Sequence, residues 1–414
     1  MQTSKKAAIG FIFITLFIDV MGWGIIIPVM ADLIAQLKGI KVNEASPYGA
    51  YLLSAFAITQ FIFSPIIGNL SDKYGRRPTL LIALLGFGID YLILALAPAY
   101  GWLFIGRVIA GITGASFTTA TAYIADVSPD ETTRAKNFGM IGAAFGLGFV
   151  LGPALGSLLS TWGIRAPFYG AAVLCLLNCI YGYFILPESL SKENRRPFDW
   201  KRANPLGSLR YLVQHPEIGG LAFSFFLIYF AAQSVQGNWN FFTSYRFGWS
   251  EKMIGISLTV VGVLVGAVQA GLTRVIIPKI GNEKSIYIGL SLYTVGLVLF
   301  AFATQGWMMF AFLVPYCLGG ICGPSLQSVI SGHVAPNEQG ALQGSLTSLM
   351  SLTTVLGPLI LNNLFAYFTS SKAPFQFPGM HFLVGALCML LAVIIAHRVL
   401  SREKKGQAGL HGAS

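Results

Sequence analysis

The chain has 414 residues, of which 55% are hydrophobic and only 10% are charged, and its formal net charge at pH 7 is +11. Soluble domains carry about 25% charged residues, so this composition excludes an ordinary soluble globular protein. The 47 glycines and 31 phenylalanines fit a helical membrane protein, because small residues let membrane helices approach one another closely.

Apolar segments long enough to cross a bilayer recur along the chain, since a spanning helix needs about 20 residues. The sequence therefore predicts an all-α membrane protein with twelve transmembrane helices. The twelve segments lie near residues 7–30, 48–70, 78–98, 100–125, 136–160, 165–187, 217–241, 251–278, 283–304, 306–332, 339–368 and 374–398.

The distribution of basic residues predicts the orientation in the membrane. An even number of spans puts both termini on one side, and a cytoplasmic assignment leaves roughly 20 Lys and Arg on that side and roughly 6 on the other. We therefore expect a multi-pass protein of the plasma (inner) membrane with both termini cytoplasmic. The basic residues are scattered over short loops, which argues against nucleic-acid binding.

A long polar segment divides the chain into two pseudo-symmetric halves of six helices each. The predicted parts are an N-terminal half (1–187), a cytoplasmic linker (188–216), a C-terminal half (217–398) and a cytoplasmic tail (399–414). A weak internal repeat supports the division, because Gly152-Pro153 in the fifth apolar segment recurs as Gly357-Pro358 in the eleventh. Transporters are commonly built from such repeated halves, with the substrate site between them.

Three charged residues interrupt the apolar segments in the first third of the chain, namely Asp19, Asp90 and Arg107. A carboxylate at the bilayer centre costs roughly 3 kcal/mol or more, so an intramembrane acid is by default a functional hypothesis. Two acids and one base predict a proton- or cation-coupled site in which Arg107 is the movable neighbour of an acid. The alternative for Arg107 is an arginine that snorkels to the membrane interface.

The segment between the second and third apolar segments has the features of a gating element. Gly68 and Gly75 permit close approach and backbone geometry that other residues disfavour. Asp72, Arg76 and Arg77 supply charges that can form ion pairs. The alternative is a positively charged cytoplasmic turn with a solubilising acid.

Two further motifs belong to the predicted gate. Asp126 closes the fourth segment, where we expect it to pair with the basic residues of the gating segment; the alternative is a solvated acid at a helix end. In the fifth segment, Gly152 and Pro153 predict a kink and close packing, because proline removes a backbone hydrogen bond. The alternative is an ordinary packed helix.

No enzyme, metal site or cofactor is predicted. The chain has no HExxH motif, no glycine-rich phosphate loop and no evident nucleophile–base pair. Free cysteine packs as a small apolar residue, and all five cysteines fall inside apolar segments. They are Cys175, Cys179, Cys317, Cys322 and Cys388.

Together these motifs resemble the major facilitator superfamily and, over nearly the whole chain, its drug:proton antiporter branch that includes the tetracycline–proton antiporters. The resemblance implies the two-half major facilitator fold and a cytoplasmic latch between Gly68–Pro78 and the eleventh segment near Gly340. It also implies an antiporter motif in the fifth segment. It is carried by Asp19 with Gly22-Trp23-Gly24, Gln60 with Ser64-Pro65, Asp90-Tyr91, Gly106–Ala115, Tyr123–Asp126, Gly255–Leu258 and Leu342–Leu346 with Gly357-Pro358.

The resemblance also assigns cavity residues. Matched one by one, five residues fall on cavity positions of the family: Asp19, Gln60, Asp90, Arg107 and Gln269. The family's histidine in the eighth span and acid in the ninth correspond here to Val265 and Tyr293. This difference argues against metal-chelated tetracycline as the substrate and leaves the coupling acid in the N-terminal half.

Neutral polar groups would then line the cavity of the second half. They are Gln233, Gln236, Asn238, Asn240, Gln269, Tyr293, Gln327 and Asn362, with Trp239 able to stack on an aromatic ligand. The alternative is that several of them only hydrogen-bond one another between helices. The predicted function is a monomeric, proton-coupled antiporter that exports a lipophilic or amphipathic small molecule by alternating access; the alternative is a proton symporter or facilitative importer of a small organic metabolite.

Overall fold

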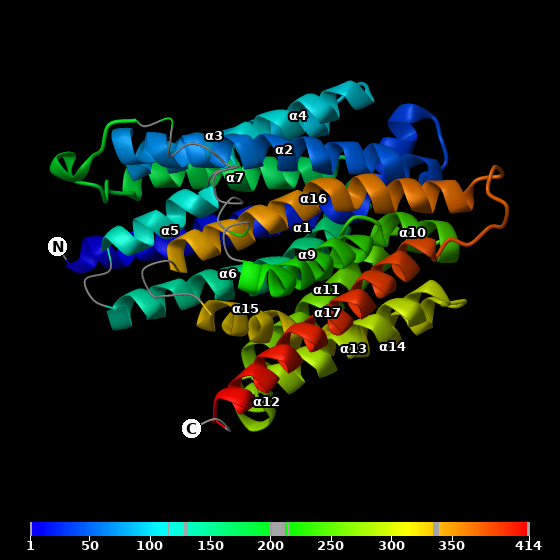
Figure 1. Cartoon of the computed structure of the whole chain (residues 1–414). Helices are drawn as coiled ribbons and strands as arrows, with labels where there is room; N and C mark the ends of the chain where they lie inside the picture. Colours follow the sequence, from blue (N-terminus) through cyan, green and yellow to red (C-terminus); the bar gives the residue numbers. More distant parts are fainter. Residues whose placement is uncertain are drawn as a thin grey trace. The chain divides into compact units, whose positions relative to one another are not determined.

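The computed structural model is helical (Figure 1). It describes residues 2–114, 116–127, 131–198, 200, 212, 216–333 and 339–411, and no strand occurs among them. Most of the expected linker, residues 201–211 and 213–215, lies outside the described residues.

Eleven helical stretches of the described chain are long and apolar enough to cross a membrane. The remaining expected span, near 251–278, is also helical but is interrupted: α11 (Glu251–Ala267), a π turn (Val268–Leu272) and α12 (Thr273–Ile280) follow one another without a gap. The all-α membrane architecture is therefore confirmed, with the eighth span built from three consecutive helical pieces.

The chain forms two compact units, one of Met1–Pro205 with Thr243–Gly262 and the other of Leu206–Phe242 with Val263–Ser414. In the first unit α1 packs against α6 and α7, α2 packs against α4, and α3 packs against α4 and α7. Its helices are α1 (Gln2–Lys38), α2 (Val42–Tyr74), α3 (Arg76–Leu96), α4 (Tyr100–Thr113), α5 (Ser116–Val127), α6 (Glu131–Leu159) and α7 (Ala166–Ile185).

In the second unit α17 packs against α9 and α13, and α16 packs against α9. Its helices are α9 (Pro216–Gln236), α10 (Trp239–Phe247), which continues into the first unit, α13 (Asn282–Ala301), α14 (Gly306–Leu318), α15 (Cys322–Gly332), α16 (Gln339–Thr369) and α17 (Met380–His411). The domain boundaries expected from the sequence stay a prediction.

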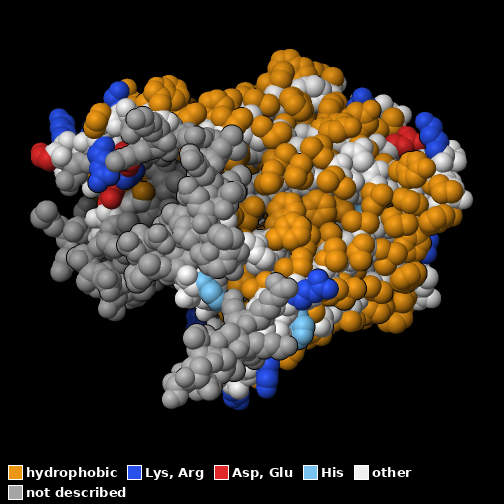
Figure 2. All heavy atoms as spheres, viewed as in Figure 1, with side chains coloured by type: hydrophobic (Ala, Val, Ile, Leu, Met, Phe, Trp, Pro, Cys, Tyr) orange, Lys and Arg blue, Asp and Glu red, His pale blue; other side chains and the backbone are white. Residues whose placement is uncertain are grey.

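The described surface is apolar over broad areas, as expected for contact with lipid. Figure 2 shows hydrophobic side chains covering most of the described part of one face. Large apolar side chains are highly exposed, among them Leu96, Trp162 and Phe184 at 63%, 78% and 76%. Soluble monomers rarely expose contiguous apolar patches of more than a few hundred Å², so these surfaces fit a bilayer rather than water.

Close packing of α1 against α6 depends on glycine. A Cβ atom on Gly152 would lie 2.7 Å from the Met21 carbonyl oxygen and 2.9 Å from the Gly24 Cα. A Cβ on Gly24 would lie 2.9 Å from Pro153 Cδ and 3.1 Å from the Gly152 Cα, so the two backbones are in direct contact. Small residues at such a contact let membrane helices gain dispersion energy over a large area.

We expect Gly152→Ala to lower the unfolding free energy by about 1–3 kcal/mol, because its methyl group must displace the α1 backbone. Gly146→Ala on the same helix is the matched control, since nothing lies within 4 Å of its Cβ position. Thermal unfolding of both variants in detergent checks this. Equal stability of the two variants would contradict the glycine contact.

Candidate functional site

A buried ion pair joins α3 and α4. The Arg107 Nε donates a hydrogen bond of 3.2 Å to Asp90 Oδ1, and Arg107 Nη2 forms an ion pair with Asp90 Oδ2. Only 5% of the Arg107 side chain and none of the Asp90 side chain are exposed. Buried charges are stable when they are paired, so the guanidinium turns toward the acid rather than snorkelling outward.

Neighbouring residues shape this pair. A Cβ on Gly106 would lie 2.7 Å from Asp90 Oδ1, so glycine at this position lets α4 approach the acid. The Arg107 guanidinium also lies over two rings, 5.8 Å from the Phe56 centroid and 5.7 Å from the Tyr91 centroid. Aromatic faces stabilise a cation that has lost its water.

Asp19, on α1, has different surroundings. Both of its carboxylate oxygens are shielded from solvent. Its polar neighbours are Tyr91 on α3 and Ser116 on α5. Asp19 forms no ion pair with any described base, so the structure pairs two of the three expected coupling residues and keeps the third apart.

Gln60, an expected residue of the substrate cavity, forms a hydrogen bond to the backbone of another span. It is half-buried on α2, and its Nε2 donates a hydrogen bond of 3.0 Å to the carbonyl oxygen of Gly114. Gly114 follows the last residue of α4, and its ψ of 34° is not helical. The amide therefore satisfies a carbonyl where the fourth span is broken.

Two of the expected substrate residues of the second unit, Trp239 and Asn238, already have partners within the fold. Trp239 is buried and lies edge-on against Phe300 at 5.3 Å, and Asn238 is buried and donates to the Leu361 carbonyl oxygen at 3.2 Å. Gln233 is also buried, Gln236 is exposed and Gln327 is half-buried. Substrate contacts of these residues stay predictions.

Gln269 and Tyr293 come together around a glycine. Gln269 lies in the π turn and is exposed, while Tyr293 packs against the Tyr316 ring at 5.0 Å. The Gln269 Nε2 and the Tyr293 hydroxyl both lie 3.7 Å from the Cβ position of Gly320. A π turn is often found at a functional site, and this one presents an amide beside a phenol.

The gating segment contains an ion-pair network. Gly75, with φ of 116°, separates α2 from α3 in a conformation that favours glycine. Arg76 Nη1 lies 2.6 Å from Asp72 Oδ1, and Arg76 Nε lies 3.1 Å from Asp126 Oδ2 on α5. The ion pair expected between Asp126 and the gating segment is thus present. The latch with the eleventh span concerns both units and stays a prediction.

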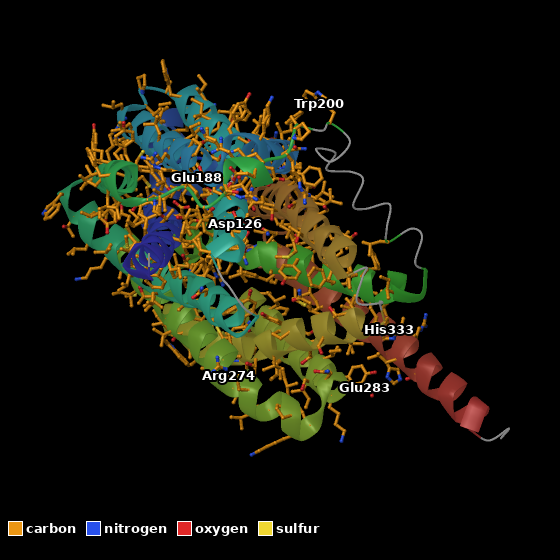
Figure 3. The ribbon with its side chains drawn as sticks, turned by 90° about the vertical axis from the view of Figure 1, so that its left-hand side faces the viewer. Asp126, Glu188, Trp200, Arg274, Glu283 and His333 are labelled. Atoms are coloured by element: carbon orange, nitrogen blue, oxygen red, sulfur yellow. The ribbon has the colours of Figure 1, made fainter. Side chains whose placement is uncertain are left out.

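Glu188, which sequence reasoning missed, supports the same segment. Its Oε1 accepts hydrogen bonds from the backbone N–H of Arg76 at 2.8 Å and of Leu190 at 3.1 Å, and its Oε2 accepts one from Arg77 at 3.3 Å. Gly75 has no side chain to cap α3, so a carboxylate far along the chain takes that role. Figure 3 shows Glu188 beside Asp126.

The start of the linker folds over this network. Ser189 donates to Asp126 Oδ2 at 3.0 Å, and the Arg196 N–H donates to the Asp72 carbonyl oxygen at 3.1 Å. Hydrogen bonds from its own backbone N–H and from Ser191 lower the pKa of exposed Glu193. A polar cavity of about 630 Å³ lies here, lined by Asp72, Arg76, Asp126, Leu190, Glu193, Arg195 and Arg196.

Gly152 and Pro153 lie on a helix that packs on both sides. Besides the α1 contact, Gly255 of α11 would place a Cβ 2.7 Å from the Pro153 carbonyl oxygen. Thr259 donates to the Val150 carbonyl oxygen at 3.3 Å. The proline does not end α6, which continues to Leu159. The residues therefore serve close packing here, and their part in gating stays a prediction.

We expect Arg107→Met to destabilise the protein by about 3–5 kcal/mol, because it leaves the Asp90 charge buried without a partner. Adding Asp90→Asn to Arg107→Met removes that charge and should recover most of the loss. Unfolding by SDS titration checks both variants. A double variant no more stable than the single one would contradict the ion pair's role.

We expect Glu188→Ala to cost roughly 0.5–2 kcal/mol of stability, as the loss of a helix cap does. The first turn of α3 should also exchange its amide protons faster, because its N–H groups lose their acceptor. Glu44→Ala is the matched control, because Glu44 accepts its exposed 3.4 Å bond from the Lys41 N–H at the start of α2, and its loss should leave the first turn of α3 unchanged. Hydrogen exchange with mass spectrometry measures the two variants. An unchanged exchange rate in the first turn of α3 of Glu188→Ala would contradict the capping role of Glu188.

Comparisons with known proteins agree with this arrangement. The class C tetracycline resistance protein of Escherichia coli is 40% identical over 92% of this chain and 93% of its own length. Multidrug resistance protein 2 of Bacillus subtilis (strain 168) is 29% identical over 89% and 91%. The crystal structure of the nucleoside transporter NupG matches with a TM-score of 0.75 at 12% identity, over 95% of this chain and 99% of that one.

The profile of the Major Facilitator Superfamily matches two overlapping stretches, residues 12–358 and 221–412. Together they cover nearly the whole chain, and the relatives above cover it equally well. The multi-pass helical architecture agrees with that assignment. The chain belongs to the Major Facilitator Superfamily and is a membrane transporter, not an enzyme.

Proposed function

We propose that this transporter is a proton-coupled antiporter that exports a lipophilic or amphipathic small molecule by alternating access. The observation that carries the proposal is the buried Asp90–Arg107 pair. Such a pair is expensive to bury and gives less stability than well-packed apolar residues would. Its presence between apolar helices is therefore best explained by a function that needs a titratable group there.

Protonation supplies the switch. A proton on Asp90 cancels its charge and removes the attraction that holds the Arg107 guanidinium in place. Arg107 is then free to rotate away from α3, and a changed α3–α4 contact biases the access state of the carrier. Asp19, buried without a base beside it, is the second proton-binding candidate in the same unit.

The ion pairs of the gating segment would change with the access state of the carrier on its cytoplasmic side. Arg76 holds Asp72 and Asp126 together within one unit. In the proposed cycle, Asp72 also meets the start of the eleventh span in one access state, where a helix N-terminus favours negative charge. Both chain termini lie on the same side as this latch, in the cytoplasm, and the membrane is the plasma membrane.

The substrate class follows from the neutral groups of the second unit. Gln269 and Tyr293 offer an amide and a phenol rather than a charge, and Val265 is apolar. These groups suit an organic molecule with aromatic and hydrogen-bonding parts, and they give no acid or imidazole to a chelated metal. The relatives' names, tetracycline resistance and multidrug resistance, support a drug-like substrate. We propose that the transporter acts as a monomer.

The direction of proton movement tests the proposal. Everted membrane vesicles containing the protein are acidified inside, and lipophilic compounds, tetracycline with and without magnesium among them, are added while internal pH is followed by dye fluorescence. Antiport predicts that a substrate raises internal pH by driving protons out. Asp90→Asn should abolish this response; because this variant leaves the Arg107 charge buried without its partner, the double variant Asp90→Asn/Arg107→Met, in which neither charge remains, is measured beside it as the control for folding.

Three outcomes would contradict the proposal. Internal acidification on adding a compound would indicate symport in place of antiport. Full proton movement in Asp90→Asn would exclude Asp90 as the coupling acid. A response to tetracycline that depends strongly on magnesium would show that the neutral groups of the second unit do not exclude a chelated substrate.

A further inference from the structure

Two spans are broken at a glycine, one in each unit. In the first unit α4 ends at Thr113 and α5 begins at Ser116, with Gly114 in a non-helical conformation. In the second unit α9 ends at Gln236 and α10 begins at Trp239. A helix break leaves carbonyl groups without their usual partners, and lipid offers none, so the protein must supply donors.

A side-chain amide from a neighbouring helix satisfies each break. Gln60 on α2 donates to the Gly114 carbonyl oxygen at 3.0 Å. Asn362 on α16, fully buried, donates to the Gly237 carbonyl oxygen at 3.0 Å. The second break has an additional bond in the opposite direction, from Asn238 to the Leu361 carbonyl oxygen at 3.2 Å. We refer to each amide–glycine contact as a clasp.

Both clasps are closely packed around a glycine. A Cβ on Gly114 would lie 2.6 Å from the Ala110 carbonyl oxygen and 3.4 Å from the Gln60 Nε2. A Cβ on Gly237 would lie 3.1 Å from both the Asn362 Oδ1 and the Gln233 carbonyl oxygen. At Gly237 the clasping side chain itself lies close to the space that a larger residue would need, whereas at Gly114 the close neighbour is the backbone of α4.

Helix α5, which follows the first break, connects two charged features of its unit. The 12-residue helix α5, about 18 Å long, begins at Ser116, the polar neighbour of Asp19. Near its other end Asp126 pairs with Arg76 of the gating segment. A rotation of α5 about Gly114 would therefore move both the surroundings of a buried acid and the gating ion pair.

We propose that Gln60 and Asn362 are positioning residues that clasp two glycine hinges, and that α5 and α10 pivot there during transport. The transport part rests on the proposed function, whereas the clasps themselves do not. Gln60 thereby acts on the helix break and not on the substrate. Because each clasp acts through a side-chain amide that donates to a backbone carbonyl, it can open and close without breaking the unit's core.

Hydrogen exchange of the purified full-length protein in detergent tests the clasps without any substrate. Gln60→Met and Asn362→Leu keep the approximate size of each side chain and remove its donor. Gln60→Met should speed exchange roughly tenfold within 116–121 and leave 237–242 unchanged. Asn362→Leu should do the reverse, so each variant is the control of the other. Gln60→Glu and Asn362→Asp replace any variant that does not fold.

Asn178→Leu is the matched control for loss of a buried amide, because Asn178 donates to the Thr15 hydroxyl at 3.1 Å away from either break. It should leave exchange in 116–121 and 237–242 unchanged. Unaltered exchange at both breaks in Gln60→Met and Asn362→Leu would overturn the clasps. For a compound found by the vesicle assay, Gln60→Met should lower turnover and preserve affinity; lost affinity with unaltered exchange would make Gln60 a ligand residue.

Discussion

The cost of leaving a polar group unpaired in an apolar surrounding decides how this structure is built. Asp90 and Arg107 are each too expensive to bury alone, so their mutual contact fixes the packing of α3 against α4. Glycine makes that packing possible: Gly106 gives space to Asp90, and Gly111 would place a Cβ only 2.6 Å from the Phe56 carbonyl oxygen of α2. The charge pair and the small residues beside it are therefore one structural feature, because neither the close approach nor the pairing is stable without the other.

The same cost applies to the backbone. Where α4 and α9 break, the free carbonyls accept hydrogen bonds from Gln60 and Asn362, and where α3 begins, its free N–H groups donate to Glu188. Each place holds a glycine, and at Gly75 and Gly237 a Cβ would come within 3.1 Å of the partner carboxylate or amide oxygen. At these three places another segment therefore brings the polar group that the helix end needs.

The sequence predicted the features that depend on composition and charge, and it missed those that depend on distant contacts. Apolar length located the spans, and the cost of buried charge predicted that Arg107 neighbours one of the two intramembrane acids, which the structure identifies as Asp90. The position of Asp126 at the end of the fourth segment predicted its pairing with the basic residues of the gating segment. The π turn in the eighth span was not predictable, because its residues are as apolar as those of a regular helix. Glu188 was missed since nothing local shows that it caps a helix 112 residues away. The sequence likewise did not indicate that His381, near a span end, is fully buried among Phe242, Phe365 and Phe382.

Gln60 shows why cavity residues are hard to assign from sequence alone. A polar side chain in a membrane helix must have a partner, and a substrate is only one of the partners available; a broken backbone is another. In the second unit the Asn238 and Asn362 side-chain amides likewise donate hydrogen bonds to backbone carbonyls, whereas Gln269 is exposed near the Tyr293 hydroxyl. The groups still open to a ligand are therefore those whose hydrogen bonds are not consumed by a helix break. Around Gly320 an exposed amide, a phenol and a π turn lie near one another.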